Sequence, residues 1–331
     1  MSLFYILAGL VLLVIGGEYL VKSSVALSLK FKLSSIIIGM TVVSFATSLP
    51  ELLVSLNAAM EGSPELAISN VVGSNIANLA LVLGTTAILT PIFIKRLSYK
   101  YNIPAMFIMS GLLYFFLKND QILSFSEGFI LFVLLVLFVI VLIRYASRSG
   151  EIDLNELEEI DKEIKVTNIY RILLWLIIGG TALWGGAELL VDGAKTLARL
   201  VGVSERIIGI SVVAIGTSIP ELAASIISAL KKEKDLSLGN LIGSNIFNIG
   251  SVLGITSMIH PIKITDLKIL NIDIIWMIAI SALILPLALL PTRNKISWVK
   301  GTIYTSLYIL YIYYFVFIPG SYNKVLTFKK I

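Results

Sequence analysis

Residues 47–51 read TSLPE and lie in the middle of an apolar segment that we place at residues 35–60. A carboxylate such as Glu51 at that depth costs about 2.5–3.5 kcal/mol to insert into a bilayer. The chain nevertheless contains the pattern twice, because residues 217–221 read TSIPE inside another apolar segment at 207–230. We therefore interpret the two stretches as the centre of the protein and the other segments as the scaffold that brings them face to face.

The composition is that of a polytopic membrane protein. Of the 331 residues, 57% are hydrophobic and 14% are charged, whereas soluble domains are about 45–50% apolar and about 25% charged. The net charge of +5 does not indicate nucleic-acid binding, because the lysines and arginines lie mostly between the apolar segments. The absence of cysteine excludes disulfides and thiolate metal sites. The first twenty residues have no basic leader and no small-residue cleavage site, so we expect them to form a retained first span.

The chain contains ten apolar segments that approach the length of roughly 20 residues needed to cross a bilayer core. We expect spans at about 3–21, 35–60, 66–90, 102–117, 127–145, 171–191, 207–230, 237–259, 269–290 and 297–318. A markedly acidic stretch separates the fifth span from the sixth. The expected domains are therefore a first five-helix repeat at 1–146, a linker at 147–168 and a second five-helix repeat at 169–331.

The two halves are copies of each other. At a fixed offset of 170 residues, positions 37–91 are identical to positions 207–261 at 24 of 55 places without a gap. Five is an odd number of spans, so the second copy enters the membrane from the opposite side. The expected fold is an all-α polytopic membrane protein, with ten transmembrane helices as two inverted five-helix repeats, an arrangement typical of secondary transporters.

The positive charges predict an orientation for this fold. If the N-terminus lies outside, loops on the cytoplasmic side receive 17 of the 26 lysines and arginines, as the positive-inside rule requires. We therefore expect both termini outside, the acidic linker in the cytoplasm and the protein in the cell (plasma) membrane.

Polar residues with helical spacing accompany each buried glutamate. Pro50 and Pro220 lack an N–H and clash with the carbonyl four residues earlier, and a carbonyl freed in lipid needs a cation, a water or a hydroxyl as a partner. We therefore expect a break in each of these spans. The polar set of the first half is Ser44, Thr47, Ser48, Glu51 and Ser55, with Asn70, Ser74 and Asn78 on the next span; the second half has Ala214, Thr217, Ser218, Glu221 and Ser225, with Asn240, Ser244 and Asn248.

Single serines and prolines in membrane helices are commonly packing or kink residues. That interpretation does not explain a duplicated glutamate beside hydroxyls and amides, so we predict that Glu51 and Glu221 are functional. Their surroundings supply only oxygen, which suits hard cations such as Ca²⁺, whereas zinc, copper and iron prefer histidine or cysteine. The one histidine, His260, corresponds to Thr90 in the other half and therefore lies outside the duplicated site. The matched acids Glu18 and Glu188 are expected near the ends of spans one and six, as interfacial residues.

The pattern GTSxPE followed by GSNIxN, present twice in two five-span halves, resembles the calcium/cation antiporter superfamily, and in particular its prokaryotic sodium/calcium exchangers. Ala46 replaces the first glycine in one copy, and residues 216–221 match the pattern throughout. The resemblance covers nearly the whole chain and implies that spans two, three, seven and eight surround the ions. By this resemblance the metal ligands would be Thr47, Ser48, Glu51, Ser74, Asn78, Thr217, Ser218, Glu221, Ser244 and Asn248, with backbone carbonyls at Ser44 and Ala214.

One departure concerns the amides. Exchangers of this type often carry aspartate at one of the positions that Asn78 and Asn248 occupy here. The proton-coupled branch has Gly-Asn-Ala before its acid, which this chain lacks. The resemblance thus implies an antiporter that exchanges Ca²⁺ for Na⁺ by alternating access, with ions bound between two glutamates.

Other functions remain open at this stage. Proton or potassium coupling keeps the transporter class, and a cation channel is a less favoured alternative. An intramembrane protease is disfavoured, because the chain contains no HExxH and its paired acids are glutamates beside Ser and Thr. We expect no enzyme activity, no cofactor and no nucleic-acid partner; the partners are the lipid bilayer, Ca²⁺ and Na⁺. The sequence does not give the oligomeric state, and a monomer is compatible with it.

Overall fold

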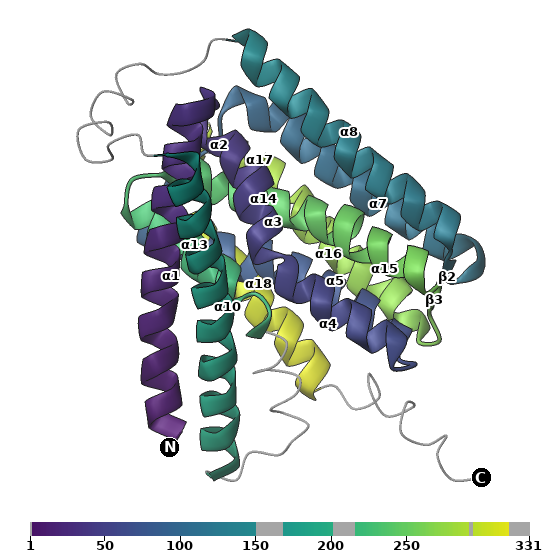
Figure 1. Cartoon of the computed structure of the whole chain (residues 1–331). Helices are drawn as coiled ribbons and strands as arrows, with labels where there is room; N and C mark the ends of the chain where they lie inside the picture. Colours follow the sequence, from purple (N-terminus) through teal and green to yellow (C-terminus); the bar gives the residue numbers. More distant parts are fainter. Residues whose placement is uncertain (1, 150–167, 201–215, 291–293, 318–331) are drawn as a thin grey trace.

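The computed structural model of the chain describes residues 2–149, 168–200, 216–290 and 294–317. These residues are helical almost throughout, and the helices pack into one bundle (Figure 1). Short π-helical turns, written η, interrupt several of the helices.

The first half contains α1 (Ser2–Phe31), α2 (Ser35–Ile38), η1 (Gly39–Val43), α3 (Ser44–Thr47), α4 (Leu49–Met60), α5 (Pro64–Ala77), η2 (Asn78–Leu83), α6 (Gly84–Leu89), η3 (Ser98–Asn102), α7 (Ile103–Asp120) and α8 (Phe125–Ser149). The second half contains α10 (Ile169–Leu200), α13 (Ile219–Leu230), α14 (Lys234–Phe247), η5 (Asn248–Leu253), α15 (Gly254–Ile259), η6 (Ile269–Asp273), α16 (Ile274–Ala282), α17 (Ile284–Leu289) and α18 (Trp298–Phe317).

The helical class and the membrane-spanning character are confirmed. Seven of the described helices are long and apolar enough to cross a bilayer, and the bent pair Ser35–Thr47 and Leu49–Met60 makes an eighth. The seventh expected span is described only from Gly216 onwards, and the tenth corresponds to α18. The number of ten spans, the three-part domain division and the acidic linker, which lies largely outside the described residues, stay predictions.

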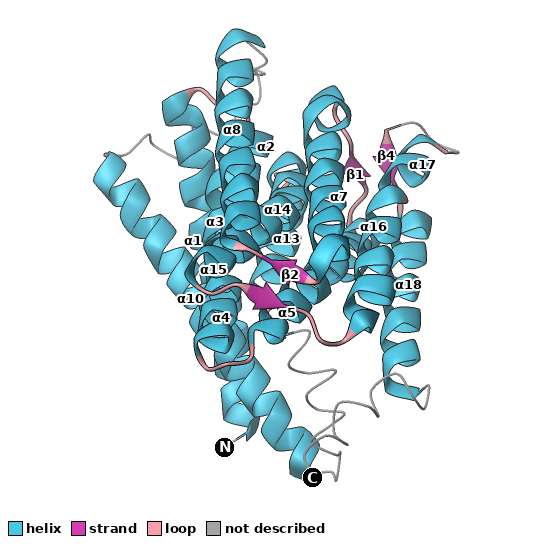
Figure 2. Ribbon diagram, turned by 90° about the vertical axis from the view of Figure 1, so that its right-hand side faces the viewer, coloured by secondary structure: helices cyan, strands magenta, loops and turns pink. Residues whose placement is uncertain are grey.

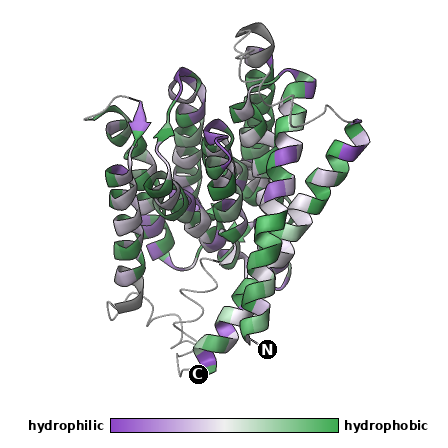
Figure 3. Ribbon diagram, turned by 90° about the vertical axis from the view of Figure 1, so that its left-hand side faces the viewer, coloured by the Kyte–Doolittle hydropathy of each residue, from purple (hydrophilic) through white to green (hydrophobic). Residues whose placement is uncertain are grey.

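The longest helices, α1 and α10, cross as an antiparallel pair and display the inverted repeat directly (Figure 1). Gly9 contacts Gly186 and Gly16 contacts Gly179, and these glycines are related by the 170-residue offset. A Cβ at Gly16 would lie 2.7 Å from the backbone nitrogen of Leu183, so only glycine allows this approach, as is common between membrane helices. Long hydrophobic stretches cover the outer face of the pair (Figure 3).

The ends of spans one and six were predicted wrongly. Helix α1 continues to Phe31 and α10 to Leu200, about ten residues beyond the expected ends. Glu18 therefore lies within α1 rather than near its end, and its carboxylate pairs with Lys231 at 3.0 Å. Hydropathy ended the expected span at the first charges, but α1 keeps buried residues as far as Ser28 and contacts α2 and α13 as well as α10.

Four two-residue strands join the halves in their loops. β1 (Ile92–Phe93) pairs with β4 (Lys295–Ile296), and β2 (Ile122–Leu123) pairs with β3 (Ile262–Lys263), both antiparallel (Figure 2). These contacts place loops from different halves at common faces of the bundle, as two inverted repeats require. Which face is cytoplasmic stays a prediction.

Polar contacts at the start of α5 and at the start of α14 involve residues that are related by the same 170-residue offset. Asp235 forms an ion pair with Lys95, and its counterpart Glu65 accepts hydrogen bonds from the Thr265 hydroxyl at 2.6 Å and the Thr265 N–H at 2.8 Å. Lys95 and Thr265 are themselves offset by 170 residues. These contacts anchor the helices from Pro64 to Leu89 and from Lys234 to Ile259, which are the most buried of the seven unbroken spans among the described residues.

Candidate cation site

The second span is broken where the sequence predicts. Ser48 has φ −86° and ψ 1°, α4 begins at the next residue, and the helices before and after it are bent by 41°. Ser218 precedes α13 in the same conformation, with φ −89° and ψ 3°. The two copies therefore share one backbone geometry at this point, although the residues before Gly216 lie outside the described part of the chain.

This geometry places both glutamates in the first turn of a helix deep inside the protein. Glu51 is the third residue of α4 and Glu221 is the third residue of α13, and both side chains are 0% exposed. None of their four carboxylate oxygens has a hydrogen-bond partner among the described residues. Buried carboxylates without donors are expensive, which favours a cation between them.

Further unpartnered oxygens come from the same positions of the two repeats. The hydroxyl oxygens of Ser48 and Ser218 and the amide oxygens of Asn78 and Asn248 are buried without a hydrogen-bond partner in the described structure. Helix packing brings these groups together across the repeats, because α4 contacts η5, which starts at Asn248, and α13 contacts η2, which starts at Asn78. The donor set consists of oxygen alone, as Ca²⁺ and Na⁺ require.

Two asparagine pairs hold these amides in place. Asn75 Nδ2 donates to the Asn245 carbonyl and Asn245 Nδ2 donates to the Asn75 carbonyl, both at 3.2 Å. Asn78 Nδ2 donates to Asn245 Oδ1 and Asn248 Nδ2 donates to Asn75 Oδ1, both at 3.1 Å. The four amides thus form a closed network across the two repeats.

The threonines and the remaining serines meet across the repeats as well. The hydroxyls of Thr47 and Ser244 lie 3.3 Å apart, and those of Ser74 and Thr217 also lie 3.3 Å apart. The Ser44 carbonyl, expected as a ligand, accepts the Ser48 N–H at 2.9 Å, which occupies part of its acceptor capacity. Ala214, the other expected carbonyl ligand, lies outside the described residues.

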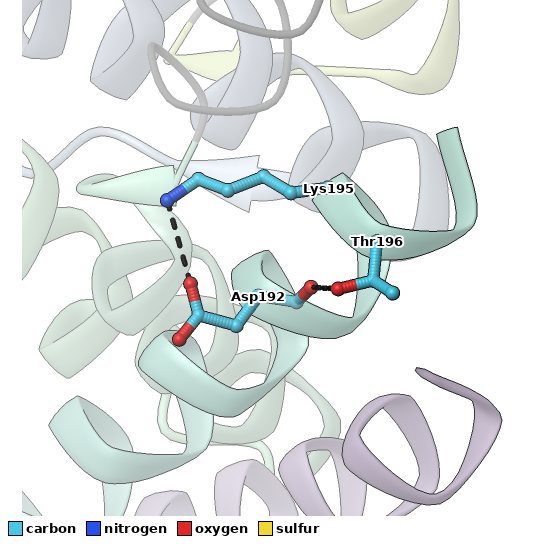
Figure 4. Close-up of polar contacts among 3 residues, drawn as sticks. All are labelled: Asp192, Lys195 and Thr196. Carbon is cyan, nitrogen blue, oxygen red and sulfur yellow. Dashed lines mark hydrogen bonds and ion pairs between the residues drawn. The ribbon is translucent and has the colours of Figure 1, made fainter. Parts of the chain in front are cut away.

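A cavity of about 1060 Å³ adjoins this site, since Pro50, Thr217 and Pro220 line it. Asn70, Gly73, Glu65 and the end of α10 belong to the same lining. Figure 4 shows that end, where Lys195 pairs with Asp192 at 3.4 Å and Thr196 donates to the Asp192 carbonyl at 2.8 Å. Glu188, expected near an interface, is exposed and lines the same cavity.

The profile of the family described as "Sodium/calcium exchanger protein" matches residues 1–144 and 171–317. The chain belongs to the sodium/calcium exchanger family. It is a multi-pass membrane transporter that exchanges cations by antiport.

Named relatives of this family member are similar over nearly their full length. A putative antiporter CaxA of Alkalimonas amylolytica is 38% identical over 310 residues, which cover 93% of this chain and 97% of the relative. The sodium/calcium exchanger MaX1 of Methanosarcina acetivorans is 28% identical over 345 residues, covering 93% of this chain and 96% of the relative.

A solved structure shows the same fold. The sodium–calcium exchanger NCX_Mj, soaked with 2.5 mM Na⁺ and 1 mM Sr²⁺, superposes with a TM-score of 0.79 at 32% identity, covering 94% of this chain and 97% of that one. The resemblance inferred from the duplicated motifs is therefore confirmed at the level of the family and the fold.

Sequence reasoning missed two features of this exchanger's candidate site. It assigned no role to Asn75 and Asn245, although they accept hydrogen bonds from the amides of Asn248 and Asn78. It also missed the π-helical turns that begin at those two amides, a feature that is frequent at functional sites. The matched Asn-x-x-Asn spacing at 75–78 and 245–248 was the available signal for both.

Proposed function

We propose that this protein exchanges Ca²⁺ for Na⁺, and that both ions bind between Glu51 and Glu221. The observation that carries the proposal is the buried set of unpartnered oxygens, contributed by matched residues of the two repeats. The candidate ligands are the ten side chains named from the resemblance, with the carbonyls of Ser44 and Ala214 as additions.

The charge of the site supports exchange of these two ions. Within the described residues no three acidic, histidine or cysteine side chains come together as a metal cluster, so the formal charge is that of the two glutamates. One Ca²⁺ or two Na⁺ would balance this charge of −2. A third Na⁺ would add positive charge inside the membrane, which is costly unless amide and hydroxyl dipoles compensate.

The two repeats differ in a way that supports alternating access. The part of the site around Asn240 is closed. Asn240 is 1% exposed, and its Oδ1 accepts hydrogen bonds from the hydroxyls of Thr47 at 3.2 Å and Ser244 at 3.4 Å. Its counterpart Asn70 lines the cavity, and no bond from Thr217 to Asn70 is found in the described structure. Inverted repeats allow the two halves to exchange these arrangements, which would carry the site from one face to the other.

The coupling ion is tested by measuring Ca²⁺ uptake into proteoliposomes under an outward gradient of Na⁺, of H⁺ or of K⁺. The proposal expects uptake with the Na⁺ gradient and little with the other two. Uptake driven by protons or potassium would instead favour one of the alternative antiporters. Uptake without any counter-gradient, saturating only with the membrane potential, would favour a channel.

We further propose the orientation and division expected from the sequence. Both termini face outside, the linker 147–168 is cytoplasmic, and the repeats are residues 1–146 and 169–331 in the plasma membrane. The cavity then opens to the outside, because the loop at Glu65 belongs to that face.

Accessibility of an engineered cysteine tests this orientation and the alternating access together. The chain has no cysteine, so Ser69→Cys places a single thiol on the exposed, cavity-lining part of α5. We expect a membrane-impermeant thiol reagent to label it from outside. The comparison applies the same reagent to Ser69→Cys from the cytoplasmic side, where we expect no labelling, because the repeat-related Gly239 packs against Ile36 and closes that face. Labelling of Ser69→Cys solely from the cytoplasm would contradict the assigned sidedness.

A charge added to the site should distinguish the two ions. Asn248→Asp raises the formal charge to −3, which helps most where an additional monovalent ion must bind. We expect the Na⁺ dependence of Ca²⁺ flux to shift more than Ca²⁺ binding does. The substitution also removes the hydrogen bond that Asn248 Nδ2 donates to Asn75 Oδ1. Because this loss affects the binding of both ions alike, the difference between the change in Na⁺ dependence and the change in Ca²⁺ binding reports the added charge. Identical Na⁺ curves in parent and variant would contradict competition of the two ions for shared ligands.

A further inference from the structure

The geometry points to Asn75 and Asn245 as positioning residues that determine which atom of Asn248 and Asn78 faces the ions. The inference deepens the proposed function and rests on it. It concerns residues that lie beside the candidate ligands and have no free oxygen of their own to offer.

The starting observation is the direction of each hydrogen bond in the amide network. Asn75 Oδ1 accepts from Asn248 Nδ2, and Asn245 Oδ1 accepts from Asn78 Nδ2, both at 3.1 Å. An amide has its nitrogen and oxygen on opposite branches, so a fixed nitrogen also fixes the oxygen. The oxygens of Asn78 and Asn248 are therefore directed away from the network, and these are the two amide oxygens that lack a partner.

The orientation of Asn75 and Asn245 is itself determined. Each side-chain nitrogen donates to the backbone carbonyl of the other residue at 3.2 Å, and a backbone carbonyl can only accept. If either amide were rotated, oxygen would face a carbonyl oxygen and nitrogen would face the nitrogen of Asn78 or Asn248. Two backbone acceptors thus set the direction of all four amides.

Burial makes this preference strong. Asn75 and Asn245 are each 1% exposed, and Asn78 and Asn248 are 0% exposed, so water cannot replace a lost bond. Buried polar networks of this kind are costly when only partly satisfied. A free amide at position 78 or 248 could turn its NH₂ toward a cation and repel it, and the network prevents this.

The network also connects the two halves of the site. Asn75 belongs to the first repeat but orients Asn248 of the second, and Asn245 does the converse. Each ion-facing amide is therefore held by the opposite repeat. In this chain Asn245 and Asn75 each accept a hydrogen bond from residue 78 or 248, which an amide supplies and an ionised carboxylate does not. The network therefore favours the neutral side chains found here and with them the charge of −2.

A double-mutant cycle on calcium transport tests this role. The variants are Asn75→Leu, Asn248→Leu and the double variant, measured as the Ca²⁺ dependence of Na⁺-driven uptake per amount of folded protein. We expect Asn75→Leu to raise the KM about tenfold to hundredfold, equivalent to about 1.4–2.8 kcal/mol, with a smaller effect on the maximal rate. In the Asn248→Leu background, adding Asn75→Leu should change the KM by less than about threefold, since the oxygen that it orients is already absent.

A matched control separates positioning from a loss of packing. Asn102 is a buried asparagine that bonds to Ser98 at 3.4 Å and belongs to η3, so Asn102→Leu should leave the KM unchanged. If Asn75→Leu does not fold, Asn75→Ser, which lacks the Oδ1 atom, enters the same cycle. An unchanged KM in the Asn75 variant, or KM effects of Asn75 and Asn248 that multiply, would overturn the positioning role. Absence of Ca²⁺ uptake in the parent would instead overturn the proposed function.

Discussion

Replacing Glu51 by Gln is expected to reduce Ca²⁺ transport by a hundredfold or more, and Glu221→Gln should do the same. Each substitution keeps the size of the side chain and leaves one carboxylate opposite a divalent ion. At a separation of about 4 Å and an effective dielectric constant of about 20, one pair of unit charges contributes about 4 kcal/mol. The other oxygens of the site are dipoles and cannot replace that charge.

The measurement is Ca²⁺ uptake into proteoliposomes by parent and variants, with equal amounts of folded protein confirmed by size-exclusion chromatography. Glu61→Gln is the matched control, because Glu61 follows the same helix but is exposed. We expect it to transport at the parental rate. Transport near the parental rate in either Glu51→Gln or Glu221→Gln would show that the carboxylate is not required.

The second large effect is expected at a pair of glycines. Gly243 of α14 packs against η1, where an added Cβ would lie 2.7 Å from the Cα and 2.8 Å from the carbonyl oxygen of Met40. Gly243→Leu should therefore force the closed face apart, lower stability by about 1–3 kcal/mol or more, and abolish exchange.

The repeat-related Gly73 makes this prediction specific to alternating access. Gly73 lines the cavity, and nothing in the described part of the chain lies within 4 Å of a Cβ built on it. Gly73→Leu should abolish exchange, because Gly73 must pack tightly once the two repeats exchange their arrangements. Exchange at the parental rate in Gly73→Leu would contradict this.

Most of the correct predictions came from the motif that occurs at Glu51 and again at Glu221. Pro50 predicted the break, which the structure places two residues earlier, at Ser48. The duplication predicted the inverted architecture, which the glycine contacts between α1 and α10 display. These features are local in sequence or repeat at a fixed offset, so one chain is sufficient to find them.

The rest depends on contacts between distant residues. The end of α1 depends on its packing against α2 and α13 as well as α10, which hydropathy does not report. The amide network joins Asn75 to residues more than 160 positions away, so its hydrogen-bond directions follow only from the folded arrangement of the repeats. The π-helical turns at Asn78 and Asn248 likewise belong to the packed core, where they place these residues beside the opposite repeat.

Coupled fluxes test the central claim most directly. Proteoliposomes are loaded with Na⁺, the external solution is free of Na⁺, and Na⁺ efflux is recorded before and after Ca²⁺ is added outside, together with Ca²⁺ entry. If both ions use one site between Glu51 and Glu221, Na⁺ should stay inside until Ca²⁺ arrives and then leave in fixed proportion to Ca²⁺ entry. Na⁺ efflux that proceeds without Ca²⁺, or Ca²⁺ entry without Na⁺ efflux, would contradict the account.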